Sequence, residues 1–350
     1  MIGIDLFSGA GGMSLGAKMA GIDVQVVVEA DKYAAETYLH NHEPKFGVFA
    51  DDIRKFNKIE INNKSPCIVF GGPPCQGFST SNQKTRTKEN LNNWLFKEFI
   101  RVAKEYKPEW IVFENVKGIL ETAKGAFVNE ILNSFNSLGY STSFKVLNAS
   151  DFGVPQNRSR FFIVASSKNI KFKFPTPHTN KCITLSQALD GLPLLENGAN
   201  KCELPYPSAA TSCYANKMRQ DLSSCKNHLV TKNNLTIIER YKHIPQGGNW
   251  ENIPEELMEN YKDRSRCHTG IYKRLHPDLP SVVIGNYRKN MLIHPFQNRG
   301  LSVREAARIQ SFPDWFEFKG SIGFQQQQVG NAVPPLLAKA LFDEILKYDM

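Results

Sequence analysis

Long apolar stretches are absent from this 350-residue sequence, and none approaches the roughly 18 residues that a membrane-spanning helix requires. The first residues also lack the basic segment and the apolar stretch of a secretory signal. We therefore expect a cytoplasmic protein that does not bind a membrane.

Cysteine is also scarce. The seven cysteines are an odd number, are widely spaced and form no Cys-x-x-Cys pair, which argues against a disulfide framework and against a zinc site. Cys225 and His228 have a spacing found in metal sites, but a second such pair is missing. We expect no metal.

Acidic residues are under-represented in one part of the chain. The net charge is +9, and residues 151–300 hold 21 lysines and arginines against 12 aspartates and glutamates, whereas the flanking segments are nearly balanced. Such a stretch either is a solvated surface or binds phosphates, and charge alone does not decide between them. The alternation of strands and helices also stops at about Pro175 and resumes near Arg299, which predicts a separate, loop-rich domain.

The amino terminus contains a strand, a glycine-rich turn and a helix. Residues 1–7 have the composition of a strand, Ser8-Gly9-Ala10-Gly11-Gly12 follows at once, and a helical pattern continues to about Ala20. Glycines let a ligand approach the backbone, and the amides at a helix start suit a carboxylate or a phosphate. A second strand over 24–28 ends in Glu29, where a dinucleotide-binding fold places the acid that binds ribose. On spacing alone, a nicotinamide site fits nearly as well.

Cys75 has the most distinctive setting of the cysteines. It follows an apolar run over 67–70 and lies in Gly71-Gly72-Pro73-Pro74-Cys75-Gln76-Gly77-Phe78-Ser79, so that turn residues hold it at the carboxyl edge of a strand. Ligands bind at that edge in open α/β sheets, and a thiol near cations or amide dipoles ionises more readily. An inert cysteine in a tight turn is the plain alternative.

The segment from Gly71 to Ser79 resembles the nucleophile motif of the cytosine 5-methyltransferases, and other motifs of that family occur in order along the chain. Asp5-Leu6-Phe7 with its glycines resembles the S-adenosylmethionine loop, and Glu114-Asn115-Val116, after a strand over 110–113, resembles the Glu-Asn-Val motif. Residues 156–160 resemble Gln-x-Arg-x-Arg, and residues 328–335 resemble the start of the last helix. An ordered series over the whole chain makes the resemblance specific.

The resemblance implies a fold and its division into domains. We expect an α/β fold with a Rossmann-like, S-adenosylmethionine-dependent methyltransferase sheet and a smaller, loop-rich target recognition domain. Residues 1–174 would form the catalytic and cofactor-binding domain, and residues 175–318 the target recognition domain. Residues 319–350 would be a C-terminal segment that returns to the catalytic domain.

The resemblance also implies roles for single residues. Cys75 would be the nucleophile, Glu114 would hold ring nitrogen 3 of cytosine, and Arg160 would bind its exocyclic oxygen. Arg158 and Arg160, two apart at the start of a strand, are expected to point to the same side and to line the cytosine pocket. The expected cofactor-binding residues are Asp5, Phe7, Gly9, Gly11, Gly12, Glu29, Asp52, Ile53, Pro74 and Asn331, although Asp51 and Asp52 could instead cap a helix. The expected DNA-binding residues are Gln76, Ser79, Lys84, Arg86 and Lys88.

The resemblance thus predicts a DNA (cytosine-5-)-methyltransferase that uses S-adenosylmethionine and flips its target base out of double-stranded DNA. We expect a monomer that serves as the modification enzyme of a restriction-modification system, with a cognate restriction endonuclease acting on the same site. A transfer-RNA cytosine-5 methyltransferase, a catalytically inactive DNA-binding relative and a nicotinamide oxidoreductase are the alternatives. The Cys-Phe-Thr tripeptide of the transfer-RNA branch is missing. Ala30, Asn90-Leu91-Asn92-Asn93 and Val282-Val283 depart from the usual family pattern.

Overall fold

Contacts divide the chain into two compact units. The computed structural model describes residues 1–62, 65–74, 94–177, 182–259, 261, 269–285, 287–289 and 291–349. Unit 1 comprises Met1–Phe152, Ser159–His178 and Pro335–Met350, and unit 2 comprises Gly153–Arg158 and Thr179–Pro334. The chain therefore returns to unit 1 at Pro335, and residues 319–334 belong with unit 2.

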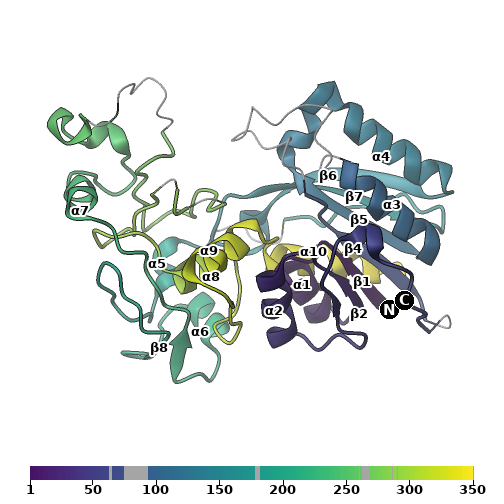
Figure 1. Cartoon of the computed structure of the whole chain (residues 1–350), viewed down its shortest axis with the longest axis horizontal. Helices are drawn as coiled ribbons and strands as arrows, with labels where there is room; N and C mark the ends of the chain where they lie inside the picture. The colour runs from purple at the N-terminus through teal and green to yellow at the C-terminus, as the bar shows by residue number, and fades with distance from the viewer. Residues whose placement is uncertain are drawn as a thin grey trace. The chain divides into compact units, whose positions relative to one another are not determined.

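Unit 1 is built on a seven-stranded sheet with the order β3-β2-β1-β4-β5-β7-β6 (Figure 1). Strands β1 to β5 pair in parallel, whereas β7 is antiparallel to β5 and β6. This confirms the expected α/β fold, and it explains the apolar runs of β4 and β5, because strands covered on both faces lose the alternation of polar and apolar residues. The strands are β1 (Ile2–Leu6), β2 (Asp23–Val28), β3 (Val48–Phe49), β4 (Cys67–Gly71), β5 (Trp110–Val116), β6 (Ser141–Asn148) and β7 (Ser159–Ser166).

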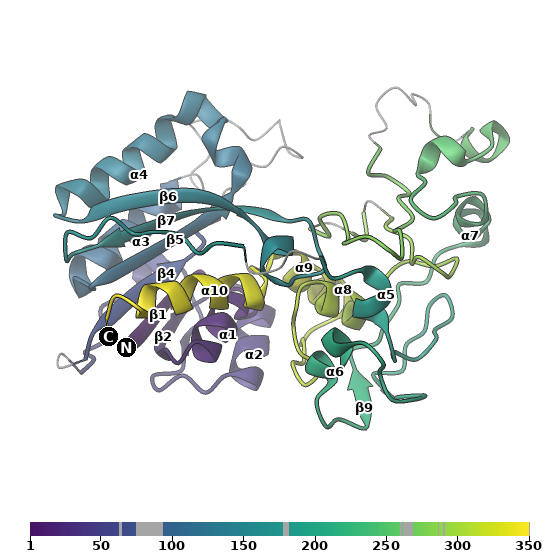
Figure 2. The same ribbon diagram turned by 180° about the vertical axis from the view of Figure 1, so that it is seen from behind.

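Helices cover both faces of this sheet (Figures 1 and 2). Helices α1 (Gly12–Met19), α2 (Lys32–Asn41) and α10 (Pro335–Leu346) lie on one side, and α3 (Leu95–Tyr106) and α4 (Ala126–Ser137) lie on the other. Phe99 of α3 packs edge-on against Phe113 of β5 with the ring centroids 5.4 Å apart. Phe342 of α10 packs in the same way against Phe70 of β4 at 5.0 Å.

The C-terminal helix α10 packs closely on α1. A Cβ atom on Gly16 would lie 2.5 Å from the Cβ of Ala338 and 2.7 Å from the carbonyl oxygen of Pro335. Only glycine permits this approach. Beyond α10, the ring of Tyr348 lies 5.7 Å from that of Trp110, and both chain ends lie beside each other in the two views (Figures 1 and 2).

Unit 2 contains less regular structure. Its helices are short, and β8 (Glu203–Pro205) and β9 (Ser224–Lys226) form a two-stranded sheet. No helix in the described part of the chain is long and apolar enough to cross a membrane. The helices of unit 2 are α5 (Leu185–Leu189), α6 (Cys213–Arg219), α7 (Leu235–Lys242), η7 (Trp250–Asn252), η8 (Glu255–Met258), α8 (Val303–Ile309) and α9 (Ile322–Asn331), and unit 1 adds η1 (Ile53–Lys55), η4 (Lys117–Leu120), η5 (Thr122–Gly125) and η6 (Ala149–Phe152).

Buried arginines satisfy many backbone carbonyls of unit 2. A carbonyl in a loop lacks the partner that a helix or a sheet would provide, and leaving it buried without a hydrogen bond is costly. Arg304 and Arg308 of α8 are both fully buried. The accepting carbonyls are those of Lys226, Pro313 and Phe316 for Arg304, of Ala188 and Asp190 for Arg308, and of Tyr241, Ile244, His294 and Gln297 for Arg274.

This arrangement reduces the number of exposed cations in the basic stretch over 151–300. Among its 21 lysines and arginines, five described arginines are buried: Arg158, Arg160, Arg240, Arg274 and Arg299. These side chains cannot reach phosphates from the surface. The charge count from the sequence therefore overstates the number of cations that a phosphate-binding face could use.

Candidate active site

The candidate site lies where the parallel strands of unit 1 end. Strands β1, β2 and β4 end at Leu6, Val28 and Gly71, and β5 carries Glu114 near its own end. The carboxyl ends of neighbouring parallel strands lie along one edge of a sheet, which is where open α/β folds bind ligands. Residues distant in the sequence therefore meet at this edge.

The glycine-rich loop after β1 has a fixed backbone. Phe7 has a φ angle of +60°, and its amide donates to the carbonyl oxygen of Val28 at 2.9 Å. Gly9 and Gly11 also have positive φ angles, and the Gly11 amide donates to Ser8. No side-chain hydrogen bond caps the start of α1 in the described structure. The amides of its first turn therefore suit an anionic group such as a carboxylate.

Glu29 is tied to this loop. Its Oε2 accepts a hydrogen bond from the Gly9 amide at 2.6 Å, and its Oε1 accepts one from the Asp31 amide at 2.7 Å. Burial raises the pKa of the Glu29 carboxyl, and the backbone hydrogen bonds oppose that rise. A carboxylate has about four acceptor positions, and the amides of Gly9, Ala30 and Asp31 use three of them, so one remains for a hydroxyl donor. This geometry fits a ribose.

Asp5 occupies a different position from the other loop residues. Its side chain is completely buried, and its Oδ2 accepts a hydrogen bond from Ser14 Oγ at 2.5 Å. Burial is the main reason why the pKa of Asp5 is well above its usual value. Asp5 was expected among the cofactor-binding residues, but the structure directs its side chain beneath the loop, toward α1.

The remaining cofactor-binding predictions divide between exposed and core positions. Asp52 accepts from the Arg54 amide at 2.9 Å at the start of η1, so the helix-cap alternative describes its present role. Hydrogen bonds from Arg54 lower the pKa of Asp52 to about 2. Ile53 belongs to the core of unit 1, and Phe7 packs against that core. Pro74 is exposed, and it is the last described residue before Cys75.

Glu114 and Arg160 form a nearly buried ion pair. Arg160 Nε lies 2.9 Å from Glu114 Oε1, and each residue is 8% exposed. The pair forms because β5 and β7 are adjacent and antiparallel, with Val116 opposite Arg160. Arg160 Nη1 also donates to the Ser159 carbonyl at 2.9 Å. Burial lowers the pKa of Arg160, and the charge of Glu114 opposes that change.

The end of β4 fits against Glu114. A Cβ atom on Gly72 would lie 2.4 Å from Glu114 Oε2, so glycine is the only residue that this position accepts without a shift. Asn115 Nδ2 donates to the carbonyl oxygen of Pro73 at 3.3 Å. The Glu-Asn-Val segment is therefore in contact with the residues that precede Cys75. Cys75 itself, with Gln76, Ser79, Lys84, Arg86 and Lys88, lies outside the described residues.

Arg158 does not share the partner of Arg160. It is fully buried, and its Nη2 donates to the carbonyl oxygens of Gly330 at 2.8 Å and Ala332 at 3.0 Å, within unit 2. Strand β7 begins at Ser159, so Arg158 precedes the strand and Arg160 lies within it; that both arginines line one cytosine pocket stays a prediction. Arg158 holds the backbone on both sides of Asn331, which is exposed at the end of α9.

Sequence reasoning missed Ser14, Tyr38 and His42. All three are buried beside the glycine-rich loop, and Tyr38 Oη donates to Ser14 Oγ at 2.8 Å. Burial and the charge of Lys18 lower the pKa of His42 to about 4, so its ring is neutral at neutral pH. Tyr38 lies in the last turn of α2 and His42 directly follows the helix, and a pair four residues apart is also found in ordinary cores.

Comparisons with known proteins identify a family to which the chain is similar over nearly its whole length. Residues 1–347 match the family model described as C-5 cytosine-specific DNA methylase. The chain is similar to Type II methyltransferase M1.HphI of Haemophilus parahaemolyticus, with 39% identity over 98% of this chain and 86% of that protein. It is also similar to M.DdeI of Desulfomicrobium norvegicum, with 34% identity over 99% of this chain and 88% of that one. An E. coli prophage protein assigned as a DNA modification methyltransferase superposes with a TM-score of 0.79 and 26% identity over 99% of both chains.

Proposed function

Because the chain belongs to the C-5 cytosine-specific DNA methylase family, we propose that this DNA (cytosine-5-)-methyltransferase methylates carbon 5 of one cytosine within a specific double-stranded DNA sequence. The observation that carries the proposal is the Glu114–Arg160 ion pair against Gly72, at the strand edge that leads to Cys75. Strands β5 and β7 deliver these two polar groups to the position where an open α/β sheet binds its substrate.

The chemistry needs a nucleophile. Carbon 5 of cytosine is too electron-poor to accept a methyl group, and addition of a thiolate to carbon 6 makes it electron-rich. Cys75 is the proposed nucleophile, and loss of the proton from carbon 5 followed by release of the thiolate restores the ring. The base must leave the stacked duplex first, at a cost of a few kcal/mol.

Glu114 and Arg160 are proposed to hold the flipped base. Glu114 would bind ring nitrogen 3 through a proton held between them and so stabilise the charge that develops on the ring when the thiolate adds. Arg160 would fix the Glu114 carboxylate through Nε. A guanidinium has five N–H donors, of which those of Arg160 bind Glu114 and Ser159 through one nitrogen each, so donors remain for the exocyclic oxygen of cytosine.

The residues of unit 1 fit S-adenosylmethionine, which supplies the methyl group when it is bound. The uncapped start of α1 suits the carboxylate of its methionine part, and Glu29 retains an acceptor position for a ribose hydroxyl. Phe7, Asp52, Ile53, Pro74 and Asn331 stay predictions for the remaining contacts. Asp5 would support the glycine-rich loop from beneath, through its hydrogen bond with Ser14.

We further propose that the enzyme belongs to a restriction-modification system. The support is that M1.HphI and M.DdeI, both similar over nearly the whole chain, are named Type II methyltransferases. A restriction endonuclease acting on the same site would then be its partner. A transfer-RNA substrate has weaker support, because the Cys-Phe-Thr tripeptide of that branch is missing from the sequence.

Bisulfite sequencing tests the proposal directly. The protein is expressed in cells that lack cytosine-5 methylation, and the cellular DNA and transfer RNA are sequenced after bisulfite treatment. We expect one methylated DNA context with the wild type and none with Cys75→Ala. A folded wild-type protein that leaves DNA unmethylated would overturn the proposal, and methylated transfer RNA would support the alternative.

A duplex with 5-fluorocytosine in the identified context then tests the nucleophile. Fluorine replaces the proton that must leave, so the enzyme should remain covalently attached to the duplex in the presence of S-adenosylmethionine. Attachment should disappear in Cys75→Ala and survive in Cys67→Ala, because Cys67 lies within β4 and is buried. A covalent complex with Cys75→Ala would exclude Cys75 as the nucleophile.

A further inference from the structure

Helix α2 connects to both ends of the proposed cofactor-binding segment of unit 1. At its start, the amide of the cap residue Asp31 donates to Glu29 Oε1 at 2.7 Å, and Asp31 Oδ1 accepts from the Ala34 amide at 2.8 Å. Its last turn and the residue that follows supply Tyr38 and His42, which lie against Gly11. One helix therefore contacts the acid proposed for the ribose and the loop proposed for the methionine part.

The contact with Gly11 is tight. A Cβ atom on Gly11 would lie 2.6 Å from His42 Nε2 and 2.8 Å from Tyr38 Cδ2. The two rings pack on each other with centroids 4.5 Å apart. Gly11 has a φ angle of +93°, which favours glycine independently of the space around it. The rings therefore support the loop backbone from below.

A hydrogen-bonded chain continues from Tyr38 to the strand that precedes the loop. Tyr38 Oη donates to Ser14 Oγ at 2.8 Å, and Ser14 Oγ donates to Asp5 Oδ2 at 2.5 Å. All three side chains are buried, and they come from α2, α1 and β1. The chain thus joins the elements on both sides of the glycine-rich loop, Asp5 before it and Ser14 after it.

We propose that Tyr38 is a positioning residue, which acts through Ser14 and Asp5 to hold the glycine-rich loop in the conformation that binds S-adenosylmethionine. The inference rests on the proposed function. Tyr38 is buried, and its hydroxyl links α2 to α1 through Ser14, while Ser14 links α1 to β1 through Asp5. Loss of the hydroxyl should leave the loop able to bind the cofactor, but with a free-energy cost for restoring its conformation.

The test uses the full-length protein with Tyr38→Phe, which removes one oxygen and keeps the ring against Gly11. We expect the affinity for S-adenosylmethionine, measured by calorimetry, to fall about fivefold to tenfold, the effect of losing one buried hydrogen bond. In methylation assays the KM for S-adenosylmethionine should rise by the same factor, while kcat at saturating cofactor stays near that of the wild type. Ser14→Ala should have a similar effect. The loss of affinity in the double variant should not exceed the sum of the losses in the two single variants.

Tyr140→Phe is the matched control. Tyr140 is also a buried tyrosine of unit 1, and its hydroxyl donates one hydrogen bond of 2.8 Å, to the carbonyl oxygen of Pro108. It should lower thermal stability about as much as Tyr38→Phe and leave cofactor affinity unchanged. Equal losses of affinity in the two variants, or unchanged affinity in Tyr38→Phe, would overturn the inference alone. A folded wild type that binds no S-adenosylmethionine would overturn the proposed function, and the inference with it.

Discussion

At the residue scale, the site depends on one carboxylate in a restricted space. Glu114 forms an ion pair with Arg160 on one side. On the other side it occupies space that is open only because Gly72 has no side chain. Two strand neighbours and a glycine fix its position, so that little reorganisation is needed when charge develops on a bound ring. The orientation of this carboxylate is therefore as important as its presence.

Glu114→Gln tests this role. The amide keeps the size of the side chain but lacks the dissociable proton and the charge, so turnover should fall about a hundredfold or more. Binding of S-adenosylmethionine and of DNA should change little. Single-turnover methylation and separate binding titrations measure the two effects. Turnover close to that of the wild type would leave Glu114 with a structural role only.

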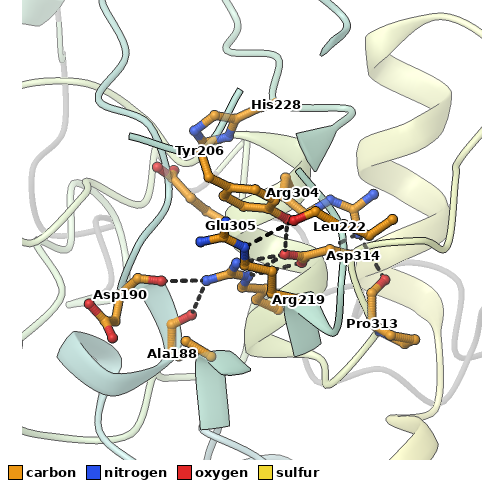
Figure 3. Close-up of polar contacts among 12 residues, drawn as sticks. Ala188, Asp190, Tyr206, Arg219, Leu222, His228, Arg304, Glu305, Pro313 and Asp314 are labelled. Carbon is orange, nitrogen blue, oxygen red and sulfur yellow. Dashed lines mark hydrogen bonds and ion pairs between the residues drawn. The ribbon is translucent and has the colours of Figure 1, made fainter. Parts of the chain in front are cut away.

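At the element scale, α8 is stabilised by charge inside unit 2. Arg308 Nη2 lies 2.6 Å from Asp314 Oδ2, and both side chains are fully buried. Tyr206 also donates to Asp314 (Figure 3). The figure further shows Ala188 and Asp190, whose carbonyl oxygens accept from Arg308. A helix of seven residues is too short to be stable alone, and these contacts hold it in place.

Asp314→Asn should therefore be strongly destabilising. Breaking a buried ion pair leaves the remaining charge without compensation, and we expect a loss of about 3 to 5 kcal/mol in urea unfolding. Glu317→Gln is the control, because Glu317 pairs with Lys226 at 2.6 Å but the two side chains are 19% and 45% exposed. Its loss should be below about 1 kcal/mol. Similar effects of the two substitutions would contradict the structural role of the buried pair.

A second element-scale prediction concerns pH. Burial lowers the pKa of His294 and of His42 to about 4, and it also lowers that of His228. The unfolded chain therefore binds more protons than the native one below the usual histidine pKa of about 6.5, and stability falls as the pH falls through that value toward 4. Each histidine should contribute at most about 2 kcal/mol to the loss by pH 5. His294→Gln should reduce the difference between urea unfolding at pH 7 and pH 5; an unchanged difference would be the contrary result.

At the scale of the whole molecule, the charge count and the burial of charge must be considered together. The basic excess over 151–300 includes five buried arginines, most of which donate to backbone carbonyls of loops. Guanidinium groups thus satisfy buried backbone carbonyls in unit 2, as pairing between strands does in unit 1. The exposed lysines and arginines are the groups left for DNA.

Binding to duplex DNA should weaken steeply with salt, because each phosphate that a cation neutralises releases a counterion. Arg288 is exposed, and if it contacts a phosphate, Arg288→Ala should lower the slope of log affinity against log salt concentration by about 1. Fluorescence anisotropy with a labelled duplex gives both slopes. An affinity that does not change between low and moderate salt would argue against a phosphate-binding face.

The sequence determined the elements and their chemistry. Apolar runs over 67–70 and 110–113 predicted β4 and β5, and the glycines after Phe7 predicted the turn into α1; the structure confirms these elements. Periodicity and turn residues act over a few neighbouring positions, so a linear sequence contains this information. The ordered motifs also predicted the family, which the match over residues 1–347 confirms.

Only the tertiary structure decided which partner each side chain has. Arg158 and Arg160 are two positions apart, yet Arg158 donates to Gly330 from just before β7, and Arg160 binds Glu114 from within it. Asp5 lies under the loop with Ser14 and Tyr38, although its motif suggested a ligand contact. Pairing between residues distant in sequence depends on where elements begin and how they pack, and neither follows from local propensity.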